Sequence, residues 1–175
     1  MDVPHPEIFK AYDIRGIVGK SLTADIVEQI GRAIGTEALA AGDRAVVVGR
    51  DGRLWGPTSA GALMEGICAT GCDAVDIGMV PTPLTYFATQ ALDIGSAVSV
   101  TGSHNPPDYN GLKVMIGTHT LAAERIQDLR KRIEDREFSV GTGQRHTEDV
   151  VPEYMRRVVA DVRLKRPLRG VTDCG

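Results

Sequence analysis

The residues with the clearest chemical potential lie in one polar segment, Thr101 to Gly111. Eight of its eleven residues are Gly, Ser, Asn, Pro or Asp, all of which form turns, and two adjacent prolines stiffen it. Ser103, His104 and Asn105 present a hydroxyl, an imidazole and an amide in succession. A loop of this length is more typical of an active site than of a plain connection, although a purely structural role stays open.

A serine in this loop can act as a nucleophile or carry a phosphoryl group. Its hydroxyl then needs a base, and the transferred group needs cations or N–H donors that spread its charge. Lys113 follows the loop on an expected return strand, which can bring its ammonium back to Ser103. The alternative is an ordinary solvated lysine on a strand.

Two further polar groups are expected at the same edge of the sheet, where strands end. Arg50, Asp51 and Arg53 follow one strand, and two arginines suit anionic oxygens. The alternative for this group is a solvated turn in which Arg50 pairs with Asp51. The second group closes another strand and can reach the same crevice: Tyr12, Asp13 and Arg15.

Motifs for other chemistries do not fit. Gly19-Lys20-Ser21 resembles the end of a P-loop, but position 14, which that motif requires to be Gly, is Ile14. No G-x-S-x-G elbow surrounds Ser103, which disfavours a hydrolase triad, and no G-x-G-x-x-G opens a helix. Cys68 and Cys72 have no second Cys/His pair at zinc spacing, so we interpret them as buried small hydrophobes.

Apolar residues recur with alternating strand and helix periods along the chain. Strands are expected at residues 8–15, 45–48, 75–80, 97–100 and 112–116, and the β-branched run 45–48 predicts a strand covered on both faces. Helices are expected at residues 23–42, 57–71, 82–91, 122–133 and 152–162, with Thr23 and Thr82 at their starts. The pattern predicts an α/β layered domain, with a mostly parallel mixed sheet between helices and ligands at the carboxyl ends of its parallel strands.

The composition suits about one soluble domain of 175 residues. A formal net charge of −3 gives no indication of a polyanion-binding protein, so no nucleic-acid partner is expected. No apolar run reaches the roughly 20 residues needed to span a bilayer, and the N-terminus lacks a signal-peptide pattern. We therefore expect a cytoplasmic protein without a membrane partner.

A change in composition predicts how the chain is divided. Residues 139–148 are polar and Gly-containing, so we expect one domain at 1–138, followed over 139–175 by a linker, a helix and the truncated start of a second domain. The strand-like end has no following helix, which indicates a fragment of a longer chain. Such a fragment should expose an apolar patch where a neighbour packed, expected on the helix that carries Tyr154, Val158, Val159 and Val162.

Four motifs occur in a characteristic order: Phe9-Lys10-Ala11-Tyr12-Asp13-Ile14-Arg15-Gly16, Val48-Gly49-Arg50-Asp51-Gly52-Arg53, Thr101-Gly102-Ser103-His104-Asn105-Pro106 and Asn110-Gly111-Leu112-Lys113. With them the chain resembles the N-terminal part of the α-D-phosphohexomutases, closest to the bacterial phosphomannomutase/phosphoglucomutase group. The glucosamine branch usually carries Thr-Asp-Gly where this chain has Ala11-Tyr12-Asp13, which counts against that branch. The end, Thr172-Asp173-Cys174-Gly175, resembles the opening of the family's second domain.

The resemblance implies an isomerase that works through a phosphorylated serine, here Ser103. That serine gives its phosphoryl group to a hexose phosphate, which forms a bound 1,6-bisphosphate. The bisphosphate then reorients and returns its other phosphoryl group to the serine. The implied catalytic residues are Ser103, His104, Lys113 and Arg15. The residues implied in phosphate or substrate binding or in loop support are Tyr12, Asn105, Arg50 and Asp51.

The resemblance also implies Mg²⁺, held by the phosphate on Ser103 and by an aspartate-rich loop of the second domain, with glucose 1,6-bisphosphate as activator. The expected partners are hexose phosphates, of mannose or of glucose, and the missing C-terminal domains. Because those domains carry the remaining ligands, we expect this chain alone to be inactive. The alternative is a non-catalytic, truncated module that binds phosphosugars or another protein.

Overall fold

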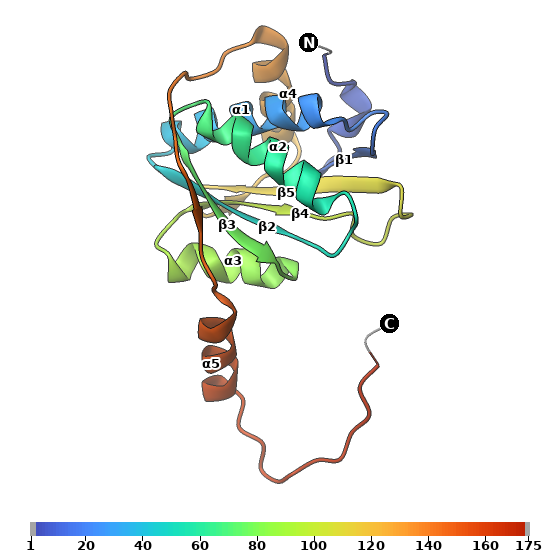
Figure 1. Cartoon of the computed structure of the whole chain (residues 1–175), viewed down its shortest axis with the longest axis vertical. Helices are drawn as coiled ribbons and strands as arrows, with labels where there is room; N and C mark the ends of the chain where they lie inside the picture. Colours follow the sequence, from blue (N-terminus) through green and yellow to red (C-terminus); the bar gives the residue numbers. More distant parts are fainter. Residues whose placement is uncertain (1–2, 174–175) are drawn as a thin grey trace.

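A mixed β-sheet forms the centre of the computed structural model, which describes residues 3–173 (Figure 1). Within these residues the sheet has seven strands in the order β1-β5-β4-β2-β3-β7, with β6 paired to β5. The strands are β1 (Ile14–Ile17), β2 (Ala45–Arg50), β3 (Asp73–Met79), β4 (Ser96–Val100), β5 (Tyr109–Ile116), β6 (His119–Thr120) and β7 (Arg145–Thr147). The helices are η1 (Pro6–Ile8), α1 (Ala24–Ala40), α2 (Gly56–Cys68), α3 (Thr82–Ala91), α4 (Glu124–Asp135) and α5 (Val151–Asp161).

The sheet has a parallel part and an antiparallel part, which confirms the predicted α/β class. β4, β2, β3 and β7 run parallel, whereas β5 returns antiparallel to β4, and β1 and β6 run antiparallel to β5. Arg50 at the end of β2 lies opposite Val100 at the end of β4. The segments that follow these two strands therefore start side by side.

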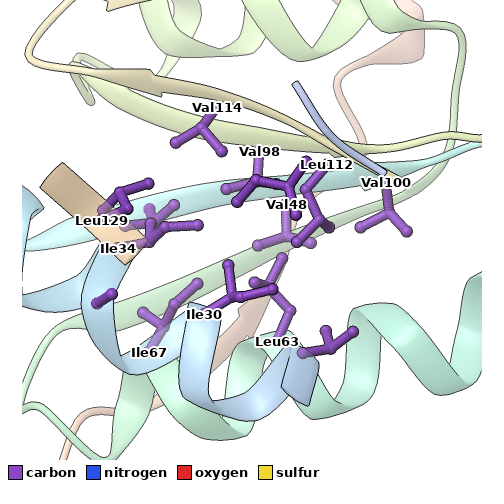
Figure 2. Packing of buried hydrophobic residues seen from close by; sticks show 14 of the residues in the cluster. Ile30, Ile34, Val48, Leu63, Ile67, Val98, Val100, Leu112, Val114 and Leu129 are labelled. Atoms are coloured by element: carbon purple, nitrogen blue, oxygen red, sulfur yellow. The ribbon is translucent and has the colours of Figure 1, made fainter. Parts of the chain in front are cut away.

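Apolar side chains cover both faces of the sheet. Helices α1, α2 and α4 pack on one face and α3 on the other (Figure 1). In β2, Val46 and Val48 belong to the first layer and Val47 to the second, which confirms a strand covered on both faces. Figure 2 shows the larger cluster, in which helix residues meet strand residues: Ile30, Ile34, Leu63, Ile67 and Leu129 with Val48, Val98, Val100, Leu112 and Val114.

The first expected strand, residues 8–15, is largely wrong. Pro6 opens a short 3₁₀ helix, whose first turn is capped by the His5 side chain. The chain then turns, because the Lys10 N–H donates to the Asp13 carbonyl at 2.9 Å, and regular pairing begins only at Ile14. Strand β5 instead begins earlier than expected, at Tyr109, because the end of the polar loop pairs with β1.

Two other expectations differ in detail. The segment expected as a linker contains β7, which adds to the sheet beside β3. All three of its residues are exposed and polar, so the sequence has no apolar alternation there. Thr23 caps α1 through its hydroxyl as expected, but Thr82 is the first residue of α3 and not its cap. The Thr82 hydroxyl lies 3.1 Å from the Ser99 hydroxyl instead.

Helix α5 carries the expected apolar patch. Val158, Val159 and Val162 are 38, 68 and 62% exposed. Tyr154 differs, because its ring packs edge-on against Phe87 of α3 with the ring centroids 5.2 Å apart. Of residues Thr172 to Gly175, expected to open a further domain, the last two lie outside the described residues.

Of the two cysteines interpreted as buried small hydrophobes, Cys72 fits this interpretation fully and Cys68 only in part. Cys72 is fully buried and Cys68 is half-buried. Burial, helped by the nearby Asp73 and Asp43 carboxylates, raises the pKa of the Cys72 thiol to about 12. Within residues 3–173 no helix combines the length and apolarity that crossing a bilayer requires.

We predict opposite effects of two glycine substitutions within α2. A Cβ at Gly66 would lie 2.0 Å from the Glu28 carbonyl of α1, whereas a Cβ at Gly61 meets nothing within 4 Å. Gly66→Ala should lower the free energy of unfolding by about 2 kcal/mol through overpacking. Gly61→Ala should raise it by about 0.5–1 kcal/mol through helix propensity. Urea unfolding measures both, and equal effects would contradict the close approach of α1 and α2.

Candidate active site

Ser103 lies at the exposed end of a wide hairpin between β4 and β5. The Thr101 N–H donates to the Gly111 carbonyl at 2.9 Å and closes the base of this hairpin. Ser103 has a φ of 52°, in the left-handed region that residues with a side chain adopt rarely. Its hydroxyl oxygen lies 3.3 Å from Nδ1 of His104. The loop thus presents a serine hydroxyl to solvent against the usual backbone preference.

Hydrogen bonds inside the loop fix the backbone next to this serine. The Ser103 N–H donates to the Thr101 hydroxyl at 3.0 Å. Asn105 donates from its side-chain amide to the Gly102 carbonyl at 2.9 Å, and its backbone N–H donates to the same oxygen at 3.1 Å. Asn105 therefore closes a turn whose centre is Ser103.

Arg15 joins β1 to this turn. Its guanidinium donates to the side-chain oxygen of Asn105 at 3.3 Å and forms an ion pair with Asp13. The Asp13 side chain is only 9% exposed, so its charge depends on this partner. Of the three residues expected at the end of the first strand, Asp13 and Arg15 are thus linked to the serine loop.

Asp51 links the end of β2 to the same loop. Its two carboxylate oxygens accept the backbone N–H groups of Arg53 and of Gly102, each at 3.0 Å. The alternative in which Arg50 pairs with Asp51 in a solvated turn is wrong, because the ion pair of Asp51 is with Arg53, at 3.6 Å. An acceptor with two oxygens suits this position because two N–H groups converge on it.

Arg53 contacts the loop backbone through both ends of its guanidinium. One terminal nitrogen donates to the carbonyls of Pro106, at 2.6 Å, and Tyr109, at 2.9 Å. The other donates to those of Asn105, at 2.6 Å, and Ser103, at 3.3 Å. The sequence suggested that this arginine binds anionic oxygens, but in the structure its partners are neutral carbonyls.

The backbone of Gly102 lies directly against the Arg53 side chain. A Cβ at Gly102 would lie 1.9 Å from Nε and 2.1 Å from Cζ of Arg53, which leaves no room for any side chain. Sequence reasoning missed this contact. The signal available was the adjacency of the two strand ends, which places the glycine after Thr101 beside the turn after Arg50.

Lys113 shares a face of the sheet with Arg15. Lys113 pairs with Ser99 and Gly111 pairs with Arg15, and residues two apart on a strand point to the same side. Met115, two residues further along, packs in the layer under α3, so this is the α3 face. Arg15 and Lys113 are therefore diagonal neighbours, which lie about 7–8 Å apart in a typical antiparallel pair.

Two of the expected residues have no direct hydrogen bond to the serine loop. Tyr12 is 74% exposed in the turn before β1. Arg50 lies beside the start of α2, where a Cβ at Gly56 would be 3.5 Å from Cδ of Arg50. No hydrogen bond joins either side chain to the loop among the residues that the structure describes.

Two hollows are lined in part by residues of the segment Thr101 to Gly111. One, of about 510 Å³, contains cationic side chains beside Arg15 and Tyr109, namely Lys10 and Lys20. The other, of about 500 Å³, is lined by Arg53, Trp55, Asn105 and Pro107 among others. The first hollow thus includes the loop only at Tyr109, whereas the second includes Asn105 and Pro107 of the loop.

The described residues do not by themselves fit a magnesium site. Mg²⁺ prefers near-octahedral oxygen ligands, several of them carboxylates or phosphates. Across residues 3–173 no group of three or more His, Cys, Asp or Glu side chains is placed to hold a metal ion. Any magnesium bound at Ser103 needs ligands from elsewhere.

Comparison with known proteins decides the family. The model of phosphoglucomutase/phosphomannomutase, alpha/beta/alpha domain I, matches residues 6–140. The chain belongs to this family. This membership confirms the resemblance inferred from the four motifs.

The relatives of this mutase-family chain are longer proteins. The phosphomannomutase/phosphoglucomutase of Pseudomonas aeruginosa is 49% identical over 168 residues, and the phosphoglucomutase of Neisseria meningitidis serogroup B is 45% identical over 171. These alignments cover 96 and 97% of this chain but 36 and 37% of the relatives. A crystal structure of a phosphoglucomutase/phosphomannomutase family protein from Burkholderia thailandensis superposes with a TM-score of 0.89 at 51% identity, covering 92% of this chain and 37% of that one.

Removal of Arg15 should destabilise this mutase-family domain by leaving a buried charge. Arg15→Ala should lower the free energy of unfolding by about 2 kcal/mol, because Asp13 loses its ion-pair partner. Adding Asp13→Asn should restore part of this loss, since a neutral amide is easier to bury. The control Arg125→Ala, at an exposed position on α4, should change stability by less than about 0.5 kcal/mol. Equal stability of the Arg15 and Arg125 variants in urea unfolding would contradict the ion pair.

Proposed function

We propose that Ser103 is the phosphoryl carrier of a phosphomannomutase/phosphoglucomutase, and that this chain is its N-terminal, nucleophile-bearing part. The observation that carries the proposal is the serine hydroxyl itself. It is exposed at a left-handed backbone position, in a loop whose carbonyls and amides are held by Arg53, Asp51 and Arg15. A hydroxyl that must accept and donate a phosphoryl group needs both access and a fixed position.

The proposed reaction interconverts hexose 1-phosphate and hexose 6-phosphate in two transfers. In the first, the bond between phosphorus and Ser103 Oγ breaks, and a bond forms between phosphorus and the free hydroxyl oxygen of the sugar. The proton of that hydroxyl passes to a basic group, and the departing Ser103 Oγ takes up a proton from an acidic group; His104 and Lys113 are the candidates for both roles. The bound 1,6-bisphosphate then reorients. Its other phosphoryl group returns to Ser103 Oγ, whose proton is lost again while the released sugar oxygen gains one, so the phosphoserine is regenerated.

The charges around the loop suit this chemistry. A phosphoserine carries about −1.5 to −2 charges at pH 7, which cations nearby would compensate. Arg15 and Lys113 share the face of the sheet next to the loop, and Lys10 and Lys20 line the adjoining hollow. Phosphoryl transfer gains most from positioning and charge compensation, and these residues offer both. We assign Tyr12 and Arg50 to substrate contacts within the same proposal.

The complete enzyme requires groups that this chain does not supply. The family is generally dependent on Mg²⁺, and we propose that oxygens of the phosphoryl group on Ser103 are among its ligands, with the rest outside this chain. Glucose 1,6-bisphosphate is proposed as the activator that phosphorylates an unmodified Ser103. Hexose phosphates of mannose or glucose are the proposed substrates. Because the chain spans 36% of a relative's length, we propose that it does not turn over alone.

A coupled mutase assay tests the role of the serine. In the longer enzyme, Ser103→Ala should lower kcat by roughly 10³-fold or more, because no other group can accept the phosphoryl. Ser139→Ala, in the segment after α4, is the matched control and should retain activity. Full activity of the Ser103 variant would overturn the proposal.

The same assay on the 175-residue chain tests the proposal that this chain alone has no mutase activity. Its rate should equal that of its own Ser103→Ala variant. A rate well above that variant would mean that the chain is a sufficient mutase. Phosphosugar binding without turnover in any longer form would favour the non-catalytic module.

A further inference from the structure

The donors of the Arg53 guanidinium are all directed at groups of the protein itself. A guanidinium has five N–H donors in a rigid fork. Four of them, on the two terminal nitrogens, serve the carbonyls of Ser103, Asn105, Pro106 and Tyr109. The fifth, on Nε, faces the Asp51 carboxylate at 3.6 Å. Both terminal nitrogens are therefore engaged by carbonyls of the protein, and the Nε side faces a carboxylate.

These contacts also set the charge environment of the loop. Each carbonyl oxygen is the negative end of a peptide dipole, and four of them converge on the Arg53 guanidinium. Unpaired, they would repel an anionic phosphoryl group on Ser103. Because the cation of Arg53 binds all four, it offsets their partial charges and turns them toward one point.

We propose that Arg53 is a positioning residue that fixes the backbone of the Ser103 loop and does not contact the phosphoryl group. The inference rests on the proposed function for its effect on rate, but its structural part stands independently. Lysine cannot replace arginine here, because a single ammonium nitrogen has three donors and no fork that spans four carbonyls. Gly102 makes this contact possible, since only a residue without a side chain lets the guanidinium lie directly against the loop backbone.

Hydrogen exchange on the 175-residue chain tests the structural part. In Arg53→Ala, amides in peptides covering residues 101–109 should exchange about tenfold faster or more, while those of β2 stay unchanged. Guanidinium at millimolar concentration should restore protection by filling the vacated position, and methylammonium should not. Trp55, the one tryptophan of the sequence, lines a hollow together with Arg53. Its fluorescence should therefore change in Arg53→Ala and return to the wild-type value when guanidinium is added. Arg44→Ala, at an exposed position, is the control.

Kinetics of the longer enzyme test the positioning role. Arg53→Ala and Arg53→Lys should lower kcat by roughly 10–100-fold, the scale of an ångström-sized misplacement, and leave KM for the hexose phosphate unchanged. Guanidinium should raise kcat of Arg53→Ala but not of Ser103→Ala. A raised KM with unchanged kcat would show that Arg53 binds substrate and would overturn the inference. So would wild-type exchange of residues 101–109 in either Arg53 variant.

The two proposals fail in different ways. If Ser103→Ala keeps full activity, the proposed function fails, while faster exchange in Arg53→Ala still supports the fixed loop. If Ser103→Ala is inactive and either Arg53 variant keeps wild-type exchange of residues 101–109, only the positioning role fails. Should Arg53→Ala not fold, Arg53→Lys, which retains the charge, carries both measurements.

Discussion

The conformation of the serine loop depends on an ion pair, Asp51 with Arg53, which lies where two parallel strands end. Strands β2 and β4 are neighbours, so the turn that carries Asp51 and Arg53 starts beside the loop that carries Ser103. The carboxylate of Asp51 satisfies two backbone N–H groups, and the guanidinium of Arg53 satisfies four carbonyls. An irregular loop lacks the regular backbone hydrogen bonds with which a sheet pairs these polar groups, and here the two side chains of the ion pair supply their partners instead. The exposed position of the serine follows from it.

The rest of the domain holds those strand ends in register. Apolar layers on both faces fix β2 between β4 and β3, and the close approach of α1 and α2 at Gly31 and Gly66 packs one layer tightly. Strand β5 then returns from the loop antiparallel to β4 and brings Lys113 onto the face shared with Arg15. In this way a sheet that is parallel on one side and antiparallel on the other brings Arg15 and Lys113, which are distant in the chain, onto one face beside the strand that leads out of the serine loop.

The sequence predicts the parts of this arrangement that have a period or a motif. The β-branched run of β2 and the apolar stripe of α2 are strong signals because burial imposes them, and the loop at Ser103 is visible through its turn residues. Strand β7 escapes prediction because an exposed edge strand needs no apolar alternation. The partners of Arg53 could not be predicted from the sequence for another reason. A guanidinium suits anions and carbonyls equally well by type, and only the three-dimensional adjacency of two strand ends shows which it meets.

The most direct test of the account is the covalent state of Ser103 in the native protein. The protein should be captured from its own cells, its intact mass measured, and its ions fragmented across residues 101–113. The account predicts a chain longer than 175 residues, with one phosphoryl group located on Ser103. A native chain of 18.8 kDa with an unmodified Ser103 would contradict it, and would favour a non-catalytic module with the same fold.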